Sequence, residues 1–405
     1  MRTIRTVSFL WLLMITMASP AFAINLNLNN SVSGHHDYLL LAEDKEYCEN
    51  YLLVNTKSHL FGETRTFAVL DLDLQFMERS RENGEDTAEE INYEVNRAKK
   101  HAPVVEHDTA EEINYEVNEA YLGIRLLENV TFTFGKKRIL WGVAFAYNPT
   151  GFVEGPVSPF DPDLKQGVYS SELSYFHHAY SLDYVLVFSG QPENFGHGLK
   201  LSLYSLFPQT DLSLMGYYAK EDGLNMGMSL ESTPFTTPFW RDLALYGEIG
   251  LVQSSFSRPQ LSGDDFYQRW LVGVRYVHPG TETAVLFEYI YLEDGFSQEE
   301  RKQLLQQQPW LNLPGPSARR SIFFNIQRPA LTKNQYPFTD TLSLAARAFR
   351  NLEDESMLLM AAITSELIKD TQISLEGTWY VGKDETEYAS LPIERVYSLV
   401  FRVDF

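Results

Sequence analysis

Hydrophobic and polar positions alternate along the C-terminal end of the chain. Residues 396–405 read Val-Tyr-Ser-Leu-Val-Phe-Arg-Val-Asp-Phe, and every second position counted back from Phe405 is apolar or aromatic. The positions between them are mostly polar and include Arg402 and Asp404. A period of two residues is that of a β-strand, whose side chains point alternately to opposite faces of a sheet. An apolar face opposite a face with charges of both signs predicts a strand with lipid outside and water inside.

Segments of similar pattern follow one another from residue 64 onward. Each has about 10 to 15 residues with imperfect alternation, and turn-forming residues separate the segments. Together they predict sixteen strands, and residues 35–60 would raise the number to eighteen. Both numbers are even, as single-chain bacterial barrels require. The predicted fold class is therefore all-β: a transmembrane antiparallel β-barrel of 16 strands, with 18 as the alternative.

Connections between the predicted strands alternate between short and long. The short ones fall at the end of the barrel where the chain finishes, at 128–129, 180–181, 209–210, 278–282 and 369–370. The long, polar ones fall at the opposite end, at 80–110, 143–167, 189–197, 253–263, 295–320 and 383–393. Short periplasmic turns and long outer loops are typical of outer-membrane barrels. A soluble β-sandwich, the alternative all-β fold, gives no reason for this sorting.

The chain begins with a pattern typical of a secretory signal peptide. Arg2 and Arg5 give a basic start, residues 7–17 are apolar, and residues 21–23 (Ala-Phe-Ala) form a small-x-small cleavage site. The apolar run is too short to cross roughly 30 Å of hydrocarbon as a helix. The expected organisation is a signal peptide at 1–23, an N-terminal segment or first strands at 24–60, and the outer-membrane barrel at 61–405.

Charge and cysteine content exclude several classes of protein. The formal net charge is −21, and loss of the two arginines in residues 1–23 brings it to −23. A surface of this sign repels phosphates, so no nucleic-acid partner is expected. The single cysteine, Cys48, can form no internal disulfide and lies about 25 residues beyond the cleavage site, too far for a lipoprotein. No run of about 18 uncharged apolar residues follows the signal, so no transmembrane helix is predicted.

Residues 119–167 contain the most specific local motif. The first strand begins Glu-Ala-Tyr-Leu at Glu119, the next reads Gly-Lys-Lys-Arg-Ile-Leu-Trp-Gly at 135–142, and a loop with Asn-Pro and Asp-Pro steps follows. This stretch resembles a broad family of poorly characterised Gram-negative outer-membrane, porin-like proteins, with the pattern EAYL, GKQxIxWG and an NP/DP loop. Lys137 replaces the usual Gln, and Gly151 stands where an acid often follows the NP step. The resemblance implies a porin-like barrel and singles out the motif residues Trp141, Gly142, Asn148 and Pro149. We expect Trp141 to lie at the membrane interface.

The loop at 143–167 is too long for a hairpin turn and too rich in Pro and Gly for a helix. Its place early in the barrel suggests that it folds inward and narrows the pore, as the third loop of general porins does. Lys137 and Arg138 would then face negative charge across the lumen, supplied by Glu154, Asp161 and Asp163. Opposed rows of charge favour small polar solutes. The alternative is that Asn148, Pro149 and the Asp-Pro steps are turn formers at the strand rim.

Further charged residues fall on the predicted lumen faces of strands. A charge on the lipid face would cost about 2–4 kcal/mol near the membrane midplane, so these side chains are expected to point inward. They are Glu248, Arg269, Arg275, Glu288, Arg347 and Arg402. The sequence leaves open whether they line a channel or hydrogen-bond within a wet interior.

A near-exact repeat precedes the motif. Residues 86–96 recur at 108–118, and the second copy runs directly into the strand that starts near residue 119. Two copies are too few for a repeat architecture. A duplication that lengthened an outer loop is the simpler interpretation, and a duplicated binding element is the alternative.

The function predicted from these features is a porin-like channel for passive diffusion of small polar solutes or ions. The alternatives are a non-conducting structural or adhesion barrel and, third, an outer-membrane enzyme. No HExxH, GxSxG or CxxC spacing occurs, so no catalytic residue, metal or cofactor is expected. The expected location is the outer membrane of a Gram-negative bacterium. Expected partners are membrane lipid and lipopolysaccharide, and the assembly machinery that would engage the strand ending at Phe405; a homo-oligomer is left open.

Overall fold

The computed structural model describes thirteen stretches of the chain. They are residues 24–41, 46–62, 66–80, 112–153, 167–189, 194–237, 239–253, 266–307, 317–329, 342–368, 371–383, 386–389 and 393–404. The predicted signal peptide at 1–23 and the first copy of the repeat, at 86–96, lie outside them. The second copy ends within a strand, as its sequence predicts.

Eighteen strands account for most of the described residues. The first nine are β1 (Ile24–Leu41), β2 (Glu46–Gly62), β3 (Thr66–Ser80), β4 (Glu112–Leu127), β5 (Val130–Lys137), β6 (Val168–His177), β7 (Tyr180–Val187), β8 (Gly196–Phe207) and β9 (Thr210–Ala219). The others are β10 (Gly223–Ser232), β11 (Leu243–Val252), β12 (Tyr267–Val277), β13 (Ala284–Leu292), β14 (Arg320–Arg328), β15 (Leu342–Asn351), β16 (Met357–Ile368), β17 (Thr371–Val381) and β18 (Ile393–Asp404).

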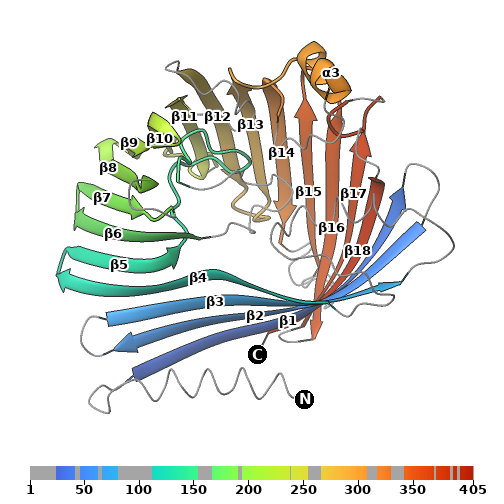
Figure 1. Ribbon diagram of the computed structural model, residues 1–405, viewed down its shortest axis with the longest axis horizontal. Helices are drawn as coiled ribbons and strands as arrows, with labels where there is room; N and C mark the ends of the chain where they lie inside the picture. Colours follow the sequence, from blue (N-terminus) through green and yellow to red (C-terminus); the bar gives the residue numbers. More distant parts are fainter. Residues whose placement is uncertain are drawn as a thin grey trace.

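The strands form one closed antiparallel barrel (Figure 1). Each strand pairs with the next in sequence, for example β11 with β12 and β17 with β18. The ring closes where β1 pairs with β18, with Gly34 opposite Phe401. The predicted fold class is confirmed, with the alternative number of eighteen strands, because residues 24–62 form β1 and β2.

Burial alternates along the strands and identifies their two faces. On β11, Tyr246 and Glu248 are buried, whereas Leu245 and Ile249 are exposed on the opposite face. On other strands whose side chains the structure describes, the outward face is also apolar, with exposed side chains at Leu122, Phe134, Leu173, Leu199, Leu214, Val272, Phe287, Phe324, Ile363, Leu375 and Leu399. An apolar belt outside and charged or polar residues inside is the arrangement expected in lipid.

The inner end of the barrel is defined here as the end at which β18 finishes, and the outer end as the opposite one. Six connections at the inner end are short; five lie within two residues of the positions predicted from the sequence, and the sixth, at 63–65, joins β2 to β3. Two others, at 233–242 and 329–341, are longer, so the expected rule of short inner turns does not hold throughout. The sequence did not predict these two long inner connections, because both contain several polar or proline residues, which also occur in outer loops.

The helix α3 (Gln298–Gln307) lies in the outer connection between β13 and β14. Its first turn is closed by a capping box in which Ser297 and Glu300 each bond the other's backbone N–H. Within the described stretches, no helix is both long and apolar enough to cross a membrane.

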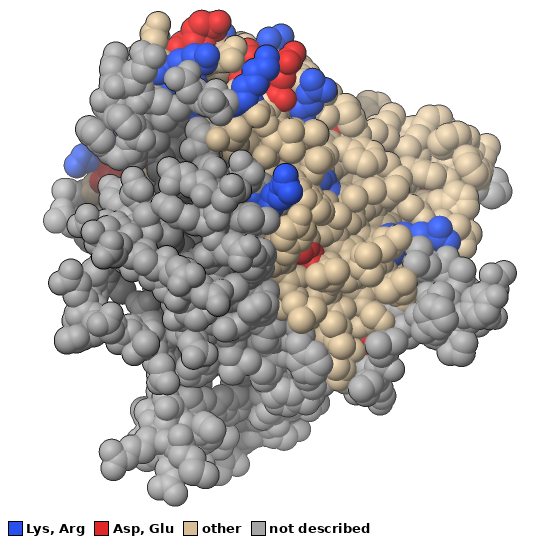
Figure 2. Space-filling view, turned by 90° about the vertical axis from the view of Figure 1, so that its right-hand side faces the viewer, with Lys and Arg blue, Asp and Glu red and all other residues tan. Residues whose placement is uncertain are grey.

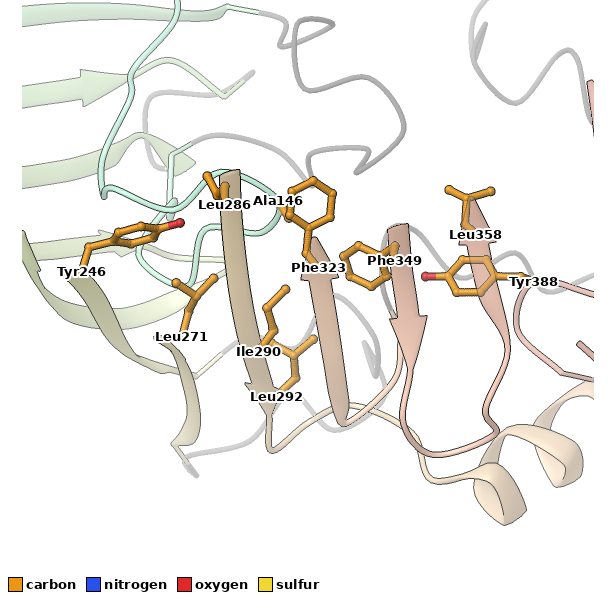
Figure 3. Packing of buried hydrophobic residues seen from close by; sticks show 10 residues of the cluster. All are labelled: Ala146, Tyr246, Leu271, Leu286, Ile290, Leu292, Phe323, Phe349, Leu358 and Tyr388. Carbon is orange, nitrogen blue, oxygen red and sulfur yellow. The ribbon is translucent and has the colours of Figure 1, made fainter. Parts of the chain in front are cut away.

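Among the described residues, the apolar core lies inside the barrel and forms two clusters. The large cluster contains Tyr246, Leu271, Leu286, Ile290, Leu292, Phe323, Phe349 and Leu358, which lie side by side along β11 to β16, and Ala146 and Tyr388 from two loops (Figure 3). The small cluster contains Ile139, Trp141, Val153, Val185, Val187, Met215, Tyr217 and Ala219. Both clusters include residues of segment 138–153, which therefore packs against the inside of the wall.

Candidate pore and its inward-folded loop

Segment 138–153 leaves the outer end of β5 and lies within the lumen. Its first part packs through Ile139 and Trp141 against the small cluster on β7 and β9. Its middle part packs through Ala146 against the large cluster on β11 to β16, together with Val143, Ala144 and Tyr147. The inward course expected for the 143–167 loop is therefore present in the part that the structure describes.

Glu248 of β11 holds this segment by its backbone. The carboxylate accepts hydrogen bonds from the backbone N–H groups of Val143 and of Ala144, the latter at 2.6 Å. Thr150 donates to it twice, from its hydroxyl at 2.9 Å and from its backbone N–H at 3.3 Å. Glu248 is only 2% exposed, so these donors replace the water that a carboxylate would otherwise need.

Glu288 of β13 makes a second anchor beside the first. Its two carboxylate oxygens accept hydrogen bonds from the backbone N–H groups of Phe145 and Ala146, at 2.7 and 2.8 Å. The phenol of Tyr246 donates to the same carboxylate at 2.7 Å. Four consecutive backbone N–H groups, from residues 143–146, are thus satisfied by two buried carboxylates of the wall.

Asn148 shapes the segment between these anchors. Its amide donates to the carbonyl oxygen of Trp141, and its Oδ1 accepts from the backbone N–H of Thr150 at 3.1 Å. The same Oδ1 lies 3.0 Å from the Thr150 hydroxyl and shares the single hydrogen of that hydroxyl with Glu248. Gly142 has a φ of +95°, a conformation that favours glycine, and a Cβ there would collide with Asn148 and Glu248. The Asn-Pro step is therefore a turn former, as the alternative interpretation held, but the turn lies inside the lumen.

Trp141 lies inside the barrel, so its expected place at the lipid interface is wrong. Only 2% of the residue is exposed, and its ring covers Gly198 on the lumen face of β8, where a Cβ would collide with the ring. Tryptophan is common at membrane interfaces, but this one packs inside the lumen. The glycine that accommodates the ring lies 57 residues further along the chain, and no local pattern links the two.

Arg269 of β12 supports the middle of the segment. Its guanidinium makes two hydrogen bonds to Asp294, at 3.0 and 2.5 Å, and also bonds the phenol of Tyr147. Burial is the largest influence on Tyr147 and raises the pKa of its phenol above the ordinary value. The buried arginine is thus neutralised by an aspartate and connected to the loop.

The basic residues at the end of β5 have partners on neighbouring strands. Lys137 faces the lumen and forms an ion pair with Glu172 of β6, with its ammonium 5.7 Å from the centre of the Tyr121 ring. The backbone N–H of Arg138 donates to the carboxylate of Glu119 at 3.0 Å. Glu119 is the acid of the EAYL motif, so this bond joins the two motif strands.

The remaining predicted site residues are spread over the barrel. Arg275 is exposed near the inner end and pairs with Glu231 at 2.8 Å. Arg347 shares the lumen face of β15 with Phe349, and Arg402 lies opposite Gln372 of β17. Three proposed constriction acids lie outside the described residues: Glu154, Asp161 and Asp163.

A second inward loop, between β17 and β18, was not predicted. Glu387 accepts hydrogen bonds from the backbone N–H and hydroxyl of Ser317 at 2.7 and 2.6 Å and from Asn351 at 2.8 Å, and pairs with Arg301 of α3 at 3.9 Å. Burial is the largest influence on Glu387 and raises the pKa of its carboxyl. Tyr388 packs against Phe349 in the large cluster. Three outer connections are thereby joined at the mouth of the barrel.

Comparisons with known proteins found solved structures of similar fold but no match by sequence. No family model and no curated protein matches the chain. Among solved structures, it is similar to OccAB1 of Acinetobacter baumannii, with a TM-score of 0.55 and 10% identity over 94% of this chain and 96% of that one. OprD of Pseudomonas aeruginosa gives a TM-score of 0.53 at 9% identity, over 96% and 95% of the two chains.

OccK2 of Pseudomonas aeruginosa, solved in complex with glucuronate, gives a TM-score of 0.53 at 10% identity over 94% and 96% of the chains. The chain has the fold of an outer-membrane channel. Barrels of this fold lie in the outer membrane of Gram-negative bacteria, and the apolar belt of this chain suits that location.

Proposed function

We propose that the chain is a porin-like channel for passive diffusion of small polar solutes or ions, narrowed by the loop that begins at residue 138. The observation that carries the proposal is the double anchor of Glu248 and Glu288 on the loop backbone. A loop held by charge-assisted hydrogen bonds keeps a fixed position in the lumen, which a size filter requires.

The charged lumen wall beside the loop supports the same proposal. The Lys137–Glu172 pair and the lumen-facing Asp183 lie on β5, β6 and β7, and Lys200 lies opposite Asp183 on β8. Charges of both signs within a few strands favour polar over apolar solutes. We further propose that Glu154, Asp161 and Asp163 continue this pattern with an excess of negative charge.

Conductance of the refolded full-length chain in a planar bilayer tests the proposal. We expect discrete current steps and, in a salt gradient, a reversal potential that indicates preference for cations. Heat-dependent migration of the barrel on a gel shows independently that the sample is folded. Absence of current from a folded sample would overturn the open-channel proposal.

One observation favours a second candidate, a barrel that does not conduct. The large apolar cluster lies on the lumen side of β11 to β16, and two loops, through Ala146 and Tyr388, pack upon it. A structural or adhesive barrel needs no open path. Under this candidate, Glu248 and Glu288 would keep the lumen closed, and their removal would create current where the parent chain shows none.

A further inference from the structure

Arginines face outward at the outer rim of β14 to β18. Arg350 lies on the exposed, outward face of β15, one residue before the strand ends. Arg320 begins β14, and Arg395 lies near the start of β18, opposite Trp379. All three therefore project at the level where the apolar belt ends, which is the headgroup region of a membrane.

Strand register gives the spacing of these arginines. Ile322 lies directly opposite Arg350, so Arg320 is its diagonal neighbour, at about 7–8 Å between side-chain positions. Arg395 lies three strand spacings from Arg350, or about 14 Å across the sheet, and two residues, or about 7 Å, further toward the inner end. The rim thus has two basic positions, one of paired arginines and one of a single arginine.

Most of the positive charge here is not neutralised by the protein. Arg320 pairs with Glu353 at 2.7 Å. Across the part of the chain that the structure describes, Arg350 and Arg395 form no ion pair, and both are exposed. An arginine that ends the apolar belt without an acidic partner indicates an anion supplied by the surroundings.

Side chains around and below the arginines suit a lipid. Trp379 and Tyr397 are in ring contact at 6.0 Å beside Arg395, and Tyr291 lies opposite Arg320. Exposed apolar side chains continue toward the inner end of these strands: Phe324, Ile363, Leu375 and Leu399. In Figure 2, the part of this face that the structure describes is mostly uncharged; charged residues gather at its top, and a few more lie lower down.

We propose that this arginine rim, formed by Arg320, Arg350 and Arg395, binds the phosphate groups of a phosphorylated glycolipid of the outer leaflet, lipid A. A disaccharide with two phosphates would reach both basic positions, and its acyl chains would cover the apolar residues below. Charge complementarity and the height of the arginines at the belt edge carry this assignment. It rests on the outer-membrane location but not on channel activity.

The test measures binding of purified lipid A to the refolded full chain in detergent micelles by native mass spectrometry. The double variant Arg350→Gln/Arg395→Gln should bind about 25-fold more weakly, because each interfacial arginine contributes about fivefold. The matched control is Arg328→Gln, which removes an arginine from the inner end of β14 and should leave binding unchanged. Heat-dependent gel migration verifies that each variant is folded.

Two further measurements distinguish binding through the phosphate groups from binding through acyl chains or divalent cations. Dephosphorylated lipid A with the same acyl chains should bind the parent chain and the double variant equally weakly. Chelation of divalent cations should leave binding to the parent chain intact. Equal binding by parent and double variant, or binding that depends only on divalent cations, would overturn the proposal. If the parent chain binds lipid A but shows no conductance, the proposed channel function is contradicted and the lipid A site is not.

Discussion

The carboxylate of Glu248 on β11 accepts two hydrogen bonds from Thr150, one from the hydroxyl and one from the backbone N–H. The two residues are 98 positions apart in the chain. This contact fixes the inward loop to a strand of the opposite half of the sequence. The position of the loop therefore depends on a few buried hydrogen-bonding groups, which single substitutions can remove.

Replacement of both anchors, Glu248→Ala together with Glu288→Ala, should release the loop. Backbone N–H groups of residues 143–146 would lose their acceptors, at a cost of about 1–3 kcal/mol for each buried group that water does not reach. We expect a larger and noisier single-channel conductance and faster protease cleavage within the loop. The control is Glu231→Gln, which breaks an exposed pair with Arg275 and should change neither readout.

Gly142→Ala should disturb the same loop through its backbone. A side chain at a φ of +95° is strained, and its Cβ would occupy the space of Asn148 and Glu248. We expect the free energy of unfolding to fall by roughly 1–3 kcal/mol, measured by urea titration of the barrel in lipid. Gly216→Ala, where a Cβ would meet nothing within 4 Å, serves as the control. Equal effects at the two glycines would contradict this account.

Ion preference should depend on the acids of the distal part of the loop. Asp161→Asn together with Asp163→Asn should shift the reversal potential in a salt gradient toward lower cation preference, because negative charge near a constriction attracts cations. Asp242→Asn, in an exposed inner connection, tests for a general effect of net charge. A reversal potential that moves equally in both cases would place the selectivity elsewhere.

Glu387 should make the stability of the docked outer loop depend on pH. Its pKa is raised from the ordinary 4.5 by burial, so the folded chain binds this proton more tightly than the unfolded chain. The resulting stabilisation is complete below pH 4.5 and is lost as pH rises through the raised pKa. Unfolding measured against pH should show this loss in the parent chain and not in Glu387→Gln. A parallel pH profile for the two chains would argue against it.

Local patterns predicted the wall of the barrel better than its contents. Alternation placed Glu248 and Glu288 on the lumen face, because strand faces follow directly from a period of two. It could not show that a loop fills the space before them, since Phe145 and Glu288 are 143 positions apart. Glu172, Asp294 and Glu387 were missed for the same reason. Their partners come from other strands and loops, and only the closed barrel brings them together.

The two buried carboxylates also impose an order on the formation of this protein. Residues 143–146 are synthesised well before Glu248 and Glu288, yet their four backbone N–H groups are satisfied by those two side chains. The loop therefore remains without its acceptors until β11 and β13 have joined the wall. Contacts of such long sequence separation are slow to form. Loop docking is thus a late event in folding, and the bore of the barrel acquires its final width only after most of the wall exists.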